Sequence, residues 1–342
     1  MFKIATFNIE NLDITSSDYS PTLEKRIPTL RGMLNRLDAD ILCLQEVHGQ
    51  ELSAHTANNP KRELSALHSV ISETQYANYF VVHTVTSDEE AYDKRNLVIL
   101  SRWPINLSQQ YKHHHLDKLE YRKATALPVE TAKEISWERP ILYAQVQVPD
   151  IGLVHVVNLH LKSRISSSVK GQKVNNYTWK SAAGWAEGYF LSSIKRVGQA
   201  LETRILVDEI FRQESNAKII VCGDFNAQPG EVPVEAICGR VENTGNPDLR
   251  DTVLLPCSSA IAESIKFSHL HHGKGNLLDH MLISQSMYHL FVKADIFNEN
   301  LHDESLPFAS DSKFPESDHA PFLATFTTLI FYFVHSVVGI DQ

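Results

Sequence analysis

The residues best suited to chemistry follow an apolar segment that ends at residue 222. The sequence IIVCGDFNAQPGE places Gly223, Asp224 and Asn226 directly after that segment. Glycine lets a chain turn and approach a ligand closely. We expect Asp224 and Asn226 to point the same way, so that one accepts a proton from water and the other donates hydrogen bonds to an anionic oxygen. The alternative is an Asx-turn that only closes the strand.

Two dipeptides join an acidic residue to a histidine. Asp279 precedes His280 at the start of one apolar segment, and Asp318 precedes His319 before another. A carboxylate that holds one nitrogen of an imidazole fixes its tautomer and supports its protonated form. We therefore expect Asp279 to orient His319 across neighbouring strands, and His280 to be structural.

Polar residues also stand at the ends of three other apolar segments. Asn8 follows the first of them, Glu46 ends ILCLQE, and Asn158 and His160 alternate along VVNLHL. In a strand of period two, Asn158 and His160 share a face. Ligands of α/β folds bind outside the carboxyl ends of strands, so these side chains are candidates for one site. Each of them alone is also compatible with capping, solvent exposure or a buried structural histidine.

Short apolar segments typical of buried strands alternate with longer helical patterns. We expect strands at 3–7, 41–44, 96–100, 141–148, 153–159, 218–222, around Leu282 and at 320–326, and helices at 21–37 and 194–211. Pro149, Asp150 and Gly152 favour a hairpin between two of these strands. Strand pairs beside strand–helix units predict one α/β domain of the α+β type, with two sheets packed face to face and helices outside.

The composition excludes several classes of protein. The 342 residues are 43% hydrophobic and 21% charged, which is ordinary for a globular protein and excludes disorder or a coiled coil. There are 32 Lys and Arg against 41 Asp and Glu, and this net charge of −9 argues against non-specific coating of nucleic acid. A local basic strip could still hold nucleic acid. Because the N-terminus lacks the pattern of a signal peptide, a cytoplasmic location is the default expectation.

The order of these motifs resembles that of the endonuclease/exonuclease/phosphatase superfamily, in particular metal-dependent phosphodiesterases related to pancreatic deoxyribonuclease and abasic-site endonucleases. The resemblance covers a domain at 1–326 and rests on Asn8, Gln45-Glu46, Asn158-x-His160, Gly223-Asp224-Phe225-Asn226, Asp279 and Ser317-Asp318-His319. It implies a four-layer sandwich of two packed mixed β-sheets flanked by helices, with the site at one edge. It also implies hydrolysis of phosphoester bonds with Mg²⁺ or Mn²⁺.

The resemblance assigns three residues to the metal. Glu46 and Asp318 would bind the ion, and Asn8 would be a further ligand or would hold a water molecule. Mg²⁺ prefers oxygen ligands and keeps several waters, so one or two carboxylates and an amide are sufficient for such a site.

The resemblance also assigns the catalytic residues. Asp224 would orient or deprotonate the attacking water, and Asn226 would hold the phosphate. His160 and His319 would contact phosphate oxygens, with Asp279 orienting His319. Phosphoryl transfer requires this combination of a positioned nucleophile and charge neutralisation.

A basic segment at 162–180 bears on the substrate. It follows His160 directly and contains no acidic residue. Lys162 and Arg164 are expected to hold phosphate groups, and Tyr177 and Trp179 to stack on bases. An endonuclease or exonuclease acting on DNA is therefore the favoured function, and an ordinary solvated loop is the alternative for this segment.

Two other functions stay open. A phosphatase or phosphodiesterase acting on phospholipid or another small phosphorylated molecule is favoured slightly by the acidic net charge and by an apolar tail at 327–342. A spanning helix needs about 20 apolar residues, so membrane contact through this shorter tail is not the favoured interpretation. The remaining alternative is a catalytically silent binding module that keeps the fold.

Overall fold

Two six-stranded mixed sheets dominate the computed structural model, which describes residues 1–16, 20–310 and 312–328. The strands of the first sheet are β1 (Phe2–Leu12), β2 (Ile41–Val47), β5 (Phe80–His83), β6 (Asn96–Ser101), β17 (Phe291–Ile296) and β18 (Phe322–Phe326). Those of the second are β7 (Ile105–Tyr111), β10 (Ile141–Val148), β11 (Gly152–His160), β12 (Lys218–Asp224), β13 (Leu255–Pro256) and β16 (Asp279–Ile283). Their spatial orders are β17-β18-β1-β2-β6-β5 and β13-β16-β12-β11-β10-β7.

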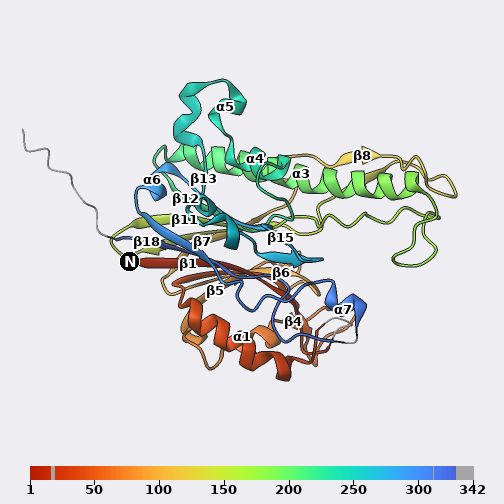
Figure 1. Cartoon of the computed structure of the whole chain (residues 1–342), viewed down its shortest axis with the longest axis horizontal. Coiled ribbons are helices and arrows are strands. Elements are labelled where there is room, and N and C mark those ends of the chain that lie inside the picture. Colours follow the sequence, from red (N-terminus) through yellow and green to blue (C-terminus); the bar gives the residue numbers. More distant parts are fainter. Residues whose placement is uncertain (17–19, 311, 329–342) are drawn as a thin grey trace, which may run out of the picture.

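Helices cover the outer face of each sheet. The first sheet packs against α1 (Leu23–Leu37) and α2 (Ser65–Ile71), and the second against α3 (Ala182–Gln213) and α4 (Val232–Cys238), which makes four layers (Figure 1). The shorter helices are α5 (Val241–Thr244), α6 (Gln285–Tyr288) and α7 (Leu306–Ala309). Six short strands form three two-stranded sheets: β3 (Gln50–Glu51) with β4 (Arg62–Glu63), β8 (Leu119–Tyr121) with β9 (Lys133–Ile135), and β14 (His269–His271) with β15 (Lys274–Asn276). The predicted sandwich of two packed sheets flanked by helices is confirmed.

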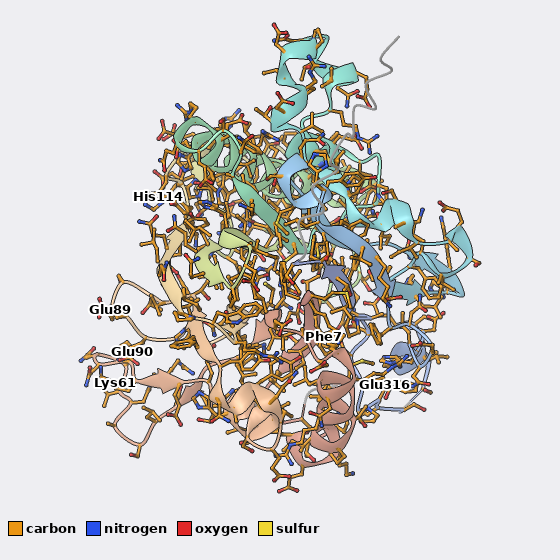
Figure 2. The ribbon with its side chains drawn as sticks, turned by 90° about the vertical axis from the view of Figure 1, so that its left-hand side faces the viewer. Phe7, Lys61, Glu89, Glu90, His114 and Glu316 are labelled. Carbon is orange, nitrogen blue, oxygen red and sulfur yellow. The ribbon has the colours of Figure 1, made fainter. Side chains whose placement is uncertain are left out.

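Alternation along the strands divides the core into layers. On β1, Ile4 packs between the two sheets, whereas its neighbour Ala5 belongs to the cluster that includes Leu30 of α1. Successive side chains of a strand point to opposite faces, so each sheet serves the central layer and one helical layer. Lys61 and Glu90, in peripheral loops, form an ion pair far from the centre of the molecule (Figure 2).

The hairpin expected after β10 is confirmed, because β10 and β11 pair antiparallel and their turn uses left-handed backbone at Asp150 and Gly152. The helix expected at 194–211 is longer, and α3 begins at Ala182. Ser181 caps it by accepting a hydrogen bond from the backbone of Gly184 at 3.0 Å. Glycines weaken the helical pattern in the first part of α3. The packing requires one of them, because a Cβ on Gly184 would collide with Gln172.

The apolar tail expected at 327–342 lies, from residue 329 on, outside the described residues. Within the described part of the chain, the structure contains no helix that is both long and apolar enough to cross a membrane.

Candidate active site

One edge of the sandwich gathers the chemically distinctive residues. The parallel pairs β1–β2 and β11–β12 both end there, to the right in Figure 1. Antiparallel pairing of β16 with β12, and of β18 with β1, brings the beginnings of β16 and β18 to the same edge. Side chains at six strand ends, which are distant in the sequence, therefore meet at one place.

Left-handed backbone positions two acidic residues at this edge. Glu10 has φ 52° and Glu46 has φ 62°, and the pairing of their strands shifts register nearby. An L-residue pays roughly 1 kcal/mol or more for this conformation, which surrounding contacts must offset. Asn8 Oδ1 accepts a hydrogen bond from the Glu10 backbone at 3.0 Å, and Glu46 Oε2 accepts one from the Asn11 backbone at 3.0 Å.

Glu10 was missed by the sequence analysis. It stands two residues after Asn8 at the end of the same strand, so the strand-end argument applied to Asn8 and Glu46 would have found it. Its carboxylate accepts a hydrogen bond from the backbone of Asp318 at 3.2 Å, which places it with the predicted metal ligands.

The carboxyl groups of Glu10, Glu46 and Asp318 thus lie near enough to influence one another's pKa. Burial and the charge of Asp318 raise the pKa of Glu10 well above its ordinary value. Burial, together with the charge of Glu46, raises the pKa of Asp318. Buried Arg26 supports the cluster by donating to the carbonyl oxygens of Ile9 and Glu10 at 2.7 and 2.8 Å. An all-oxygen donor set with mutual repulsion suits a hard divalent cation, so these residues fit Mg²⁺ or Mn²⁺.

Asp224 lies beside this cluster in a dense network of hydrogen bonds. Its Oδ2 accepts from the amide of Asn8 at 3.1 Å and from that of Asn226 at 3.0 Å, and its Oδ1 accepts from the backbone of Asn226 at 2.8 Å. Burial, reinforced by the charge of Asp279 and opposed by that of His319, raises the pKa of Asp224 to about 7. The carboxyl is therefore poised to exchange a proton near neutral pH.

The glycine before Asp224 has a steric reason. Gly223 has φ 134°, and a Cβ built there would lie 2.0 Å from the carbonyl oxygen of Leu159. The close approach of β12 to β11 aligns His160 with Asp224 in the pairing of the two strands. The expected turn at this glycine is wrong, because Gly223 lies inside β12 and its close approach is to the neighbouring strand β11.

Asp279 and His319 form the expected pair. His319 Nδ1 lies 2.7 Å from Asp279 Oδ2. The prediction that neighbouring strands carry them is wrong, because Asp279 begins β16 of the second sheet and His319 precedes β18 of the first. Although burial opposes it, the charges of Asp279 and then Asp224 raise the pKa of His319 well above its ordinary value, which favours the protonated ring. His280 is structural as expected, since its Nε2 bonds the carbonyl of Ala227 at 2.7 Å.

His160 has the opposite electrostatic character. Its Nε2 lies 3.4 Å from Asp224 Oδ2 and 3.5 Å from Glu46 Oε1. Burial, followed by the charges of Arg139 and Arg95, lowers its pKa well below the ordinary value. The site therefore combines one imidazole whose surroundings favour the neutral form with one whose surroundings favour the protonated form.

Asn158 joins the sheets and does not face the acidic cluster. Its Oδ1 accepts from Gln45 Nε2 at 2.7 Å, and its Nδ2 lies 3.0 Å from the carbonyl oxygens of both Leu44 and Val98. All of these groups are buried, so the bonds hold the end of β2, and with it Glu46, against the second sheet.

The predicted substrate-binding residues are distributed more widely. Lys162 is largely buried and donates to Ser163 Oγ at 2.9 Å. Arg164 pairs with Glu231 at 2.8 Å and donates to the carbonyl of Asn226 at 3.2 Å, which puts its guanidinium beside the site. Trp179 packs into a small satellite core, with the Lys173 ammonium 4.7 Å from its ring centre, whereas Tyr177 is 73% exposed.

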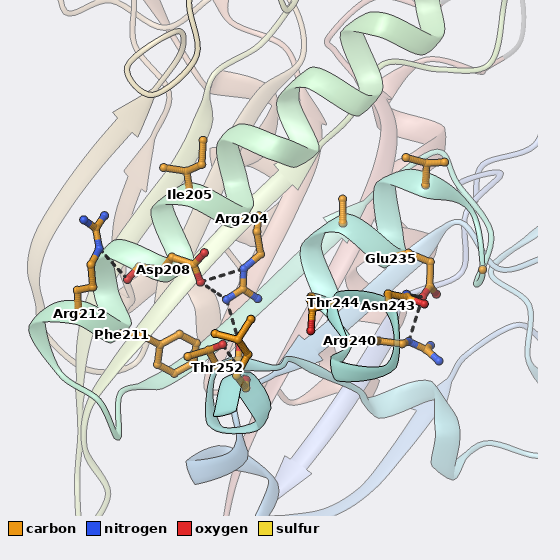
Figure 3. A pocket seen from close by; sticks show the side chains of 15 residues that line it. Arg204, Ile205, Asp208, Phe211, Arg212, Glu235, Arg240, Asn243, Thr244 and Thr252 are labelled. Atoms are coloured by element: carbon orange, nitrogen blue, oxygen red, sulfur yellow. Dashed lines mark hydrogen bonds and ion pairs between the residues drawn. The ribbon is translucent and has the colours of Figure 1, made fainter. Parts of the chain in front are cut away.

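A large cavity lies away from this edge. About 940 Å³ in volume, it is formed by α3, α4 and α5, and no predicted site residue lines it. Its charged side chains are already paired, Arg204 with Asp208 and Arg240 with Glu235 (Figure 3). The concentration of titratable groups distinguishes the strand-end site from this cavity.

Comparison with known proteins agrees with the geometry. Residues 5–319 match the Endonuclease/Exonuclease/phosphatase family. The chain belongs to this family. It is accordingly a hydrolase that acts on phosphoester bonds. A comparison with curated protein sequences finds no match.

Solved structures share the family fold at low identity. A 3′ phosphatase from Neisseria bound to a product DNA hairpin is 17% identical, with a TM-score of 0.50 over 96% of this chain and 100% of that one. A mannosyl-6-phosphatase from Bacteroides thetaiotaomicron is 14% identical, with a TM-score of 0.53 over the same shares of 96% and 100%. A family protein of the same organism is 13% identical, with a TM-score of 0.55 over 94% and 96%.

Proposed function

We propose that this family member is a Mg²⁺- or Mn²⁺-dependent phosphodiesterase that cleaves DNA. The observation that supports the chemistry best is the combination, at one edge, of a three-carboxylate cluster with Asp224 and with a protonated histidine. Hydrolysis of a phosphodiester needs an attacking water, a way to remove its proton, and positive charge beside the phosphate oxygens. The described residues supply a candidate for each requirement.

The roles follow from protonation and contact. Asp224, with its pKa near 7, orients and deprotonates the water. The Asn226 amide donates to Asp224 Oδ2 at 3.0 Å and to the carbonyl of Leu161 at 3.1 Å, so it holds the Asp224 carboxyl in place and has no hydrogen left for the phosphate. The His319 imidazolium, held by Asp279 at 2.7 Å, stabilises negative charge on the non-bridging oxygens. Neutral His160 serves as a hydrogen-bond donor toward the same phosphate.

Glu10, Glu46 and Asp318 would hold the divalent ion, with Asn8 beside them. When bound, the ion polarises the phosphate and neutralises charge that grows in the transition state. Asn8 also donates to Asp224 at 3.1 Å, which couples the general base to the metal-binding residues.

Two residues of the basic segment support DNA as the substrate. Arg164 reaches the site through the carbonyl of Asn226, and exposed Tyr177 offers a ring on which a base can stack. A structural neighbour from Neisseria binds a DNA hairpin, and the family includes endonucleases and exonucleases. We propose phosphate contact for Arg164 and base stacking for Tyr177.

The test is Mg²⁺-dependent cleavage by the wild type and Asp224→Asn, with Asp150→Asn as the control. Asp150 is exposed in the turn between β10 and β11, so its substitution should leave the rate unchanged. Supercoiled plasmid, single-stranded DNA, RNA, bis-p-nitrophenyl phosphate, p-nitrophenyl phosphate and phosphoinositide vesicles are the substrates. We expect DNA cleavage that Asp224→Asn reduces at least 10²-fold.

Other outcomes would separate chemistry from substrate. Turnover of a monoester or of vesicles without cleavage of DNA would retain the mechanism and overturn the substrate. Equal activity of the wild type and Asp224→Asn on every substrate would overturn the mechanism.

Base stacking has its own test. Tyr177→Ala should raise KM for single-stranded DNA several-fold and leave hydrolysis of bis-p-nitrophenyl phosphate unchanged, because only the polymer extends to the rim. Tyr288→Ala is the matched control, since Tyr288 is also exposed, at 48%, but lies on α6 at the opposite end of the sandwich. An equal effect of both substitutions would contradict the proposed stacking.

A further inference from the structure

A third histidine lies against the active site and has no role in the proposed reaction. His269 begins β14 and forms an isolated antiparallel bridge with His319. Their ring centres are 5.2 Å apart, and His269 is only 7% exposed. The tertiary structure thus places a buried imidazole beside residues at the edge where the phosphate is expected.

Each of these two histidines is held by a carboxylate at one nitrogen. His269 Nε2 lies 3.0 Å from Glu304 Oε2, just as His319 Nδ1 lies 2.7 Å from Asp279 Oδ2. The second nitrogen of His269, Nδ1, is buried and has no hydrogen-bond partner among the described residues. Leaving a buried polar atom unpaired costs roughly 1–3 kcal/mol, so this nitrogen calls for a ligand.

Asp318 completes the group. One ligand atom from each of His269, Asp318 and His319 lies within 4.8 Å of the other two. A histidine that binds a metal usually gives its other ring nitrogen to a carboxylate, as both rings do here. Two imidazoles and one carboxylate suit a transition ion better than Mg²⁺, which prefers oxygen ligands alone.

We propose that His269, Asp318 and His319 form a second cation site, specific for a divalent transition ion, next to the oxygen-lined site of Glu10 and Glu46. The proposal rests on the proposed function at two residues: Asp318 also belongs to the oxygen-lined site, and His319 acts as an imidazolium toward the phosphate only while the second site is empty. An imidazole must be unprotonated to bind a metal, so an ion that enters this site displaces a proton from His319.

The experiment is a Mn²⁺ titration of the full chain without substrate. Free Mn²⁺ is counted by electron paramagnetic resonance, and pulsed measurements detect nitrogen coordinated to the bound ion. We expect two Mn²⁺ per wild-type chain, with nitrogen coupling on one of them. His269→Gln should bind one ion and lose most of the coupling, and Glu304→Gln should weaken the second ion about 10-fold or more.

His271→Gln is the matched control. His271 lies on the same strand and contacts the same Glu304 oxygen at 2.9 Å, but its side chain is 44% exposed and outside the group of three. This variant should still bind two ions with nitrogen coupling.

The outcomes distinguish this proposal from the proposed function. A single Mn²⁺ without nitrogen coupling in the wild type would overturn the second site. This measurement uses only the wild-type protein, so it does not depend on whether a variant folds. If that same protein still cleaves phosphodiesters with Mg²⁺, the proposed function survives. Two ions with unchanged coupling in His269→Gln would also overturn the site, whereas absence of any bound Mn²⁺ would overturn both proposals.

Discussion

Asp224→Asn should make the metal-free protein more stable at pH 8 while abolishing catalysis. Burial raises the pKa of Asp224 from 3.8 to about 7. Since the folded value exceeds the unfolded one, folding takes up a proton between these values, and stability is lost as pH rises through this window. Three pKa units correspond to roughly 4 kcal/mol of penalty at pH 8, and to about 1–2 kcal/mol at pH 5.

The substitution also has a cost. Asp224 accepts hydrogen bonds at both oxygens from Asn8 and Asn226, and an asparagine can present only one oxygen. At least one buried donor then loses its acceptor, which lowers the free energy of unfolding by about 1–3 kcal/mol. The net change is therefore a gain of about 1–3 kcal/mol at pH 8, and a neutral or unfavourable change at pH 5.

Thermal unfolding in EDTA at both pH values measures this change. For 342 residues, an unfolding entropy of about 2.1 cal/mol/K per residue gives about 0.7 kcal/mol/K, so a gain of about 2 kcal/mol raises Tm by about 3 °C. Asp150→Asn, an exposed control, should shift Tm little at either pH. A lower Tm of Asp224→Asn at pH 8, or a difference that does not change with pH, would refute the reasoning.

Four further substitutions or conditions test other contacts. Gly223→Ala should destabilise the protein by more than about 3 kcal/mol in urea unfolding, because its Cβ would meet the Leu159 carbonyl at 2.0 Å; an unchanged midpoint would contradict the close approach of the strands. Asn158→Ala should cost about 2–4 kcal/mol through the lost bonds to Gln45 and two carbonyls, and a loss below about 0.5 kcal/mol would show that it does not clamp the sheets. Glu10→Gln should weaken Mg²⁺ binding in calorimetry about 10-fold or more, and unchanged affinity would remove Glu10 from the metal site. Cleavage of DNA under kcat/KM conditions should fall steeply as salt increases, and a flat response would argue against phosphate contacts in the basic segment.

Local pattern was sufficient for the central strands of the two sheets, which carry the site residues, whereas the edge strands β5, β7, β13 and β17 were not predicted. The apolar segments before Asn8, Glu46, Asp224 and His319 predict strand ends or beginnings, and an edge shared by such ends follows from the rules of sheet packing. The resemblance in motif order led to the correct family because the motifs are spread over nearly the whole chain. The first part of α3 was not predicted, since glycines that its neighbours require weaken the helical pattern.

Contacts between the two sheets were beyond the reach of the sequence. Asp279 holds His319 from the opposite sheet, and Gln45 meets Asn158 in the same way. The role of His269 as a neighbour of His319 depends on the β14 hairpin folding back onto this edge. Periodicity describes which face of its own strand a residue occupies, but it carries no information on which strand of another sheet lies opposite.

The protonation states were decided by the tertiary structure for the same reason. Residue types at strand ends determine that carboxylates, amides and histidines meet, and so they determine the class of reaction. Whether His319 is charged and His160 neutral depends on burial and on charges from elements far away in the sequence. Desolvation and Coulomb interactions act through distances in space, and only packing of the two sheets sets those distances.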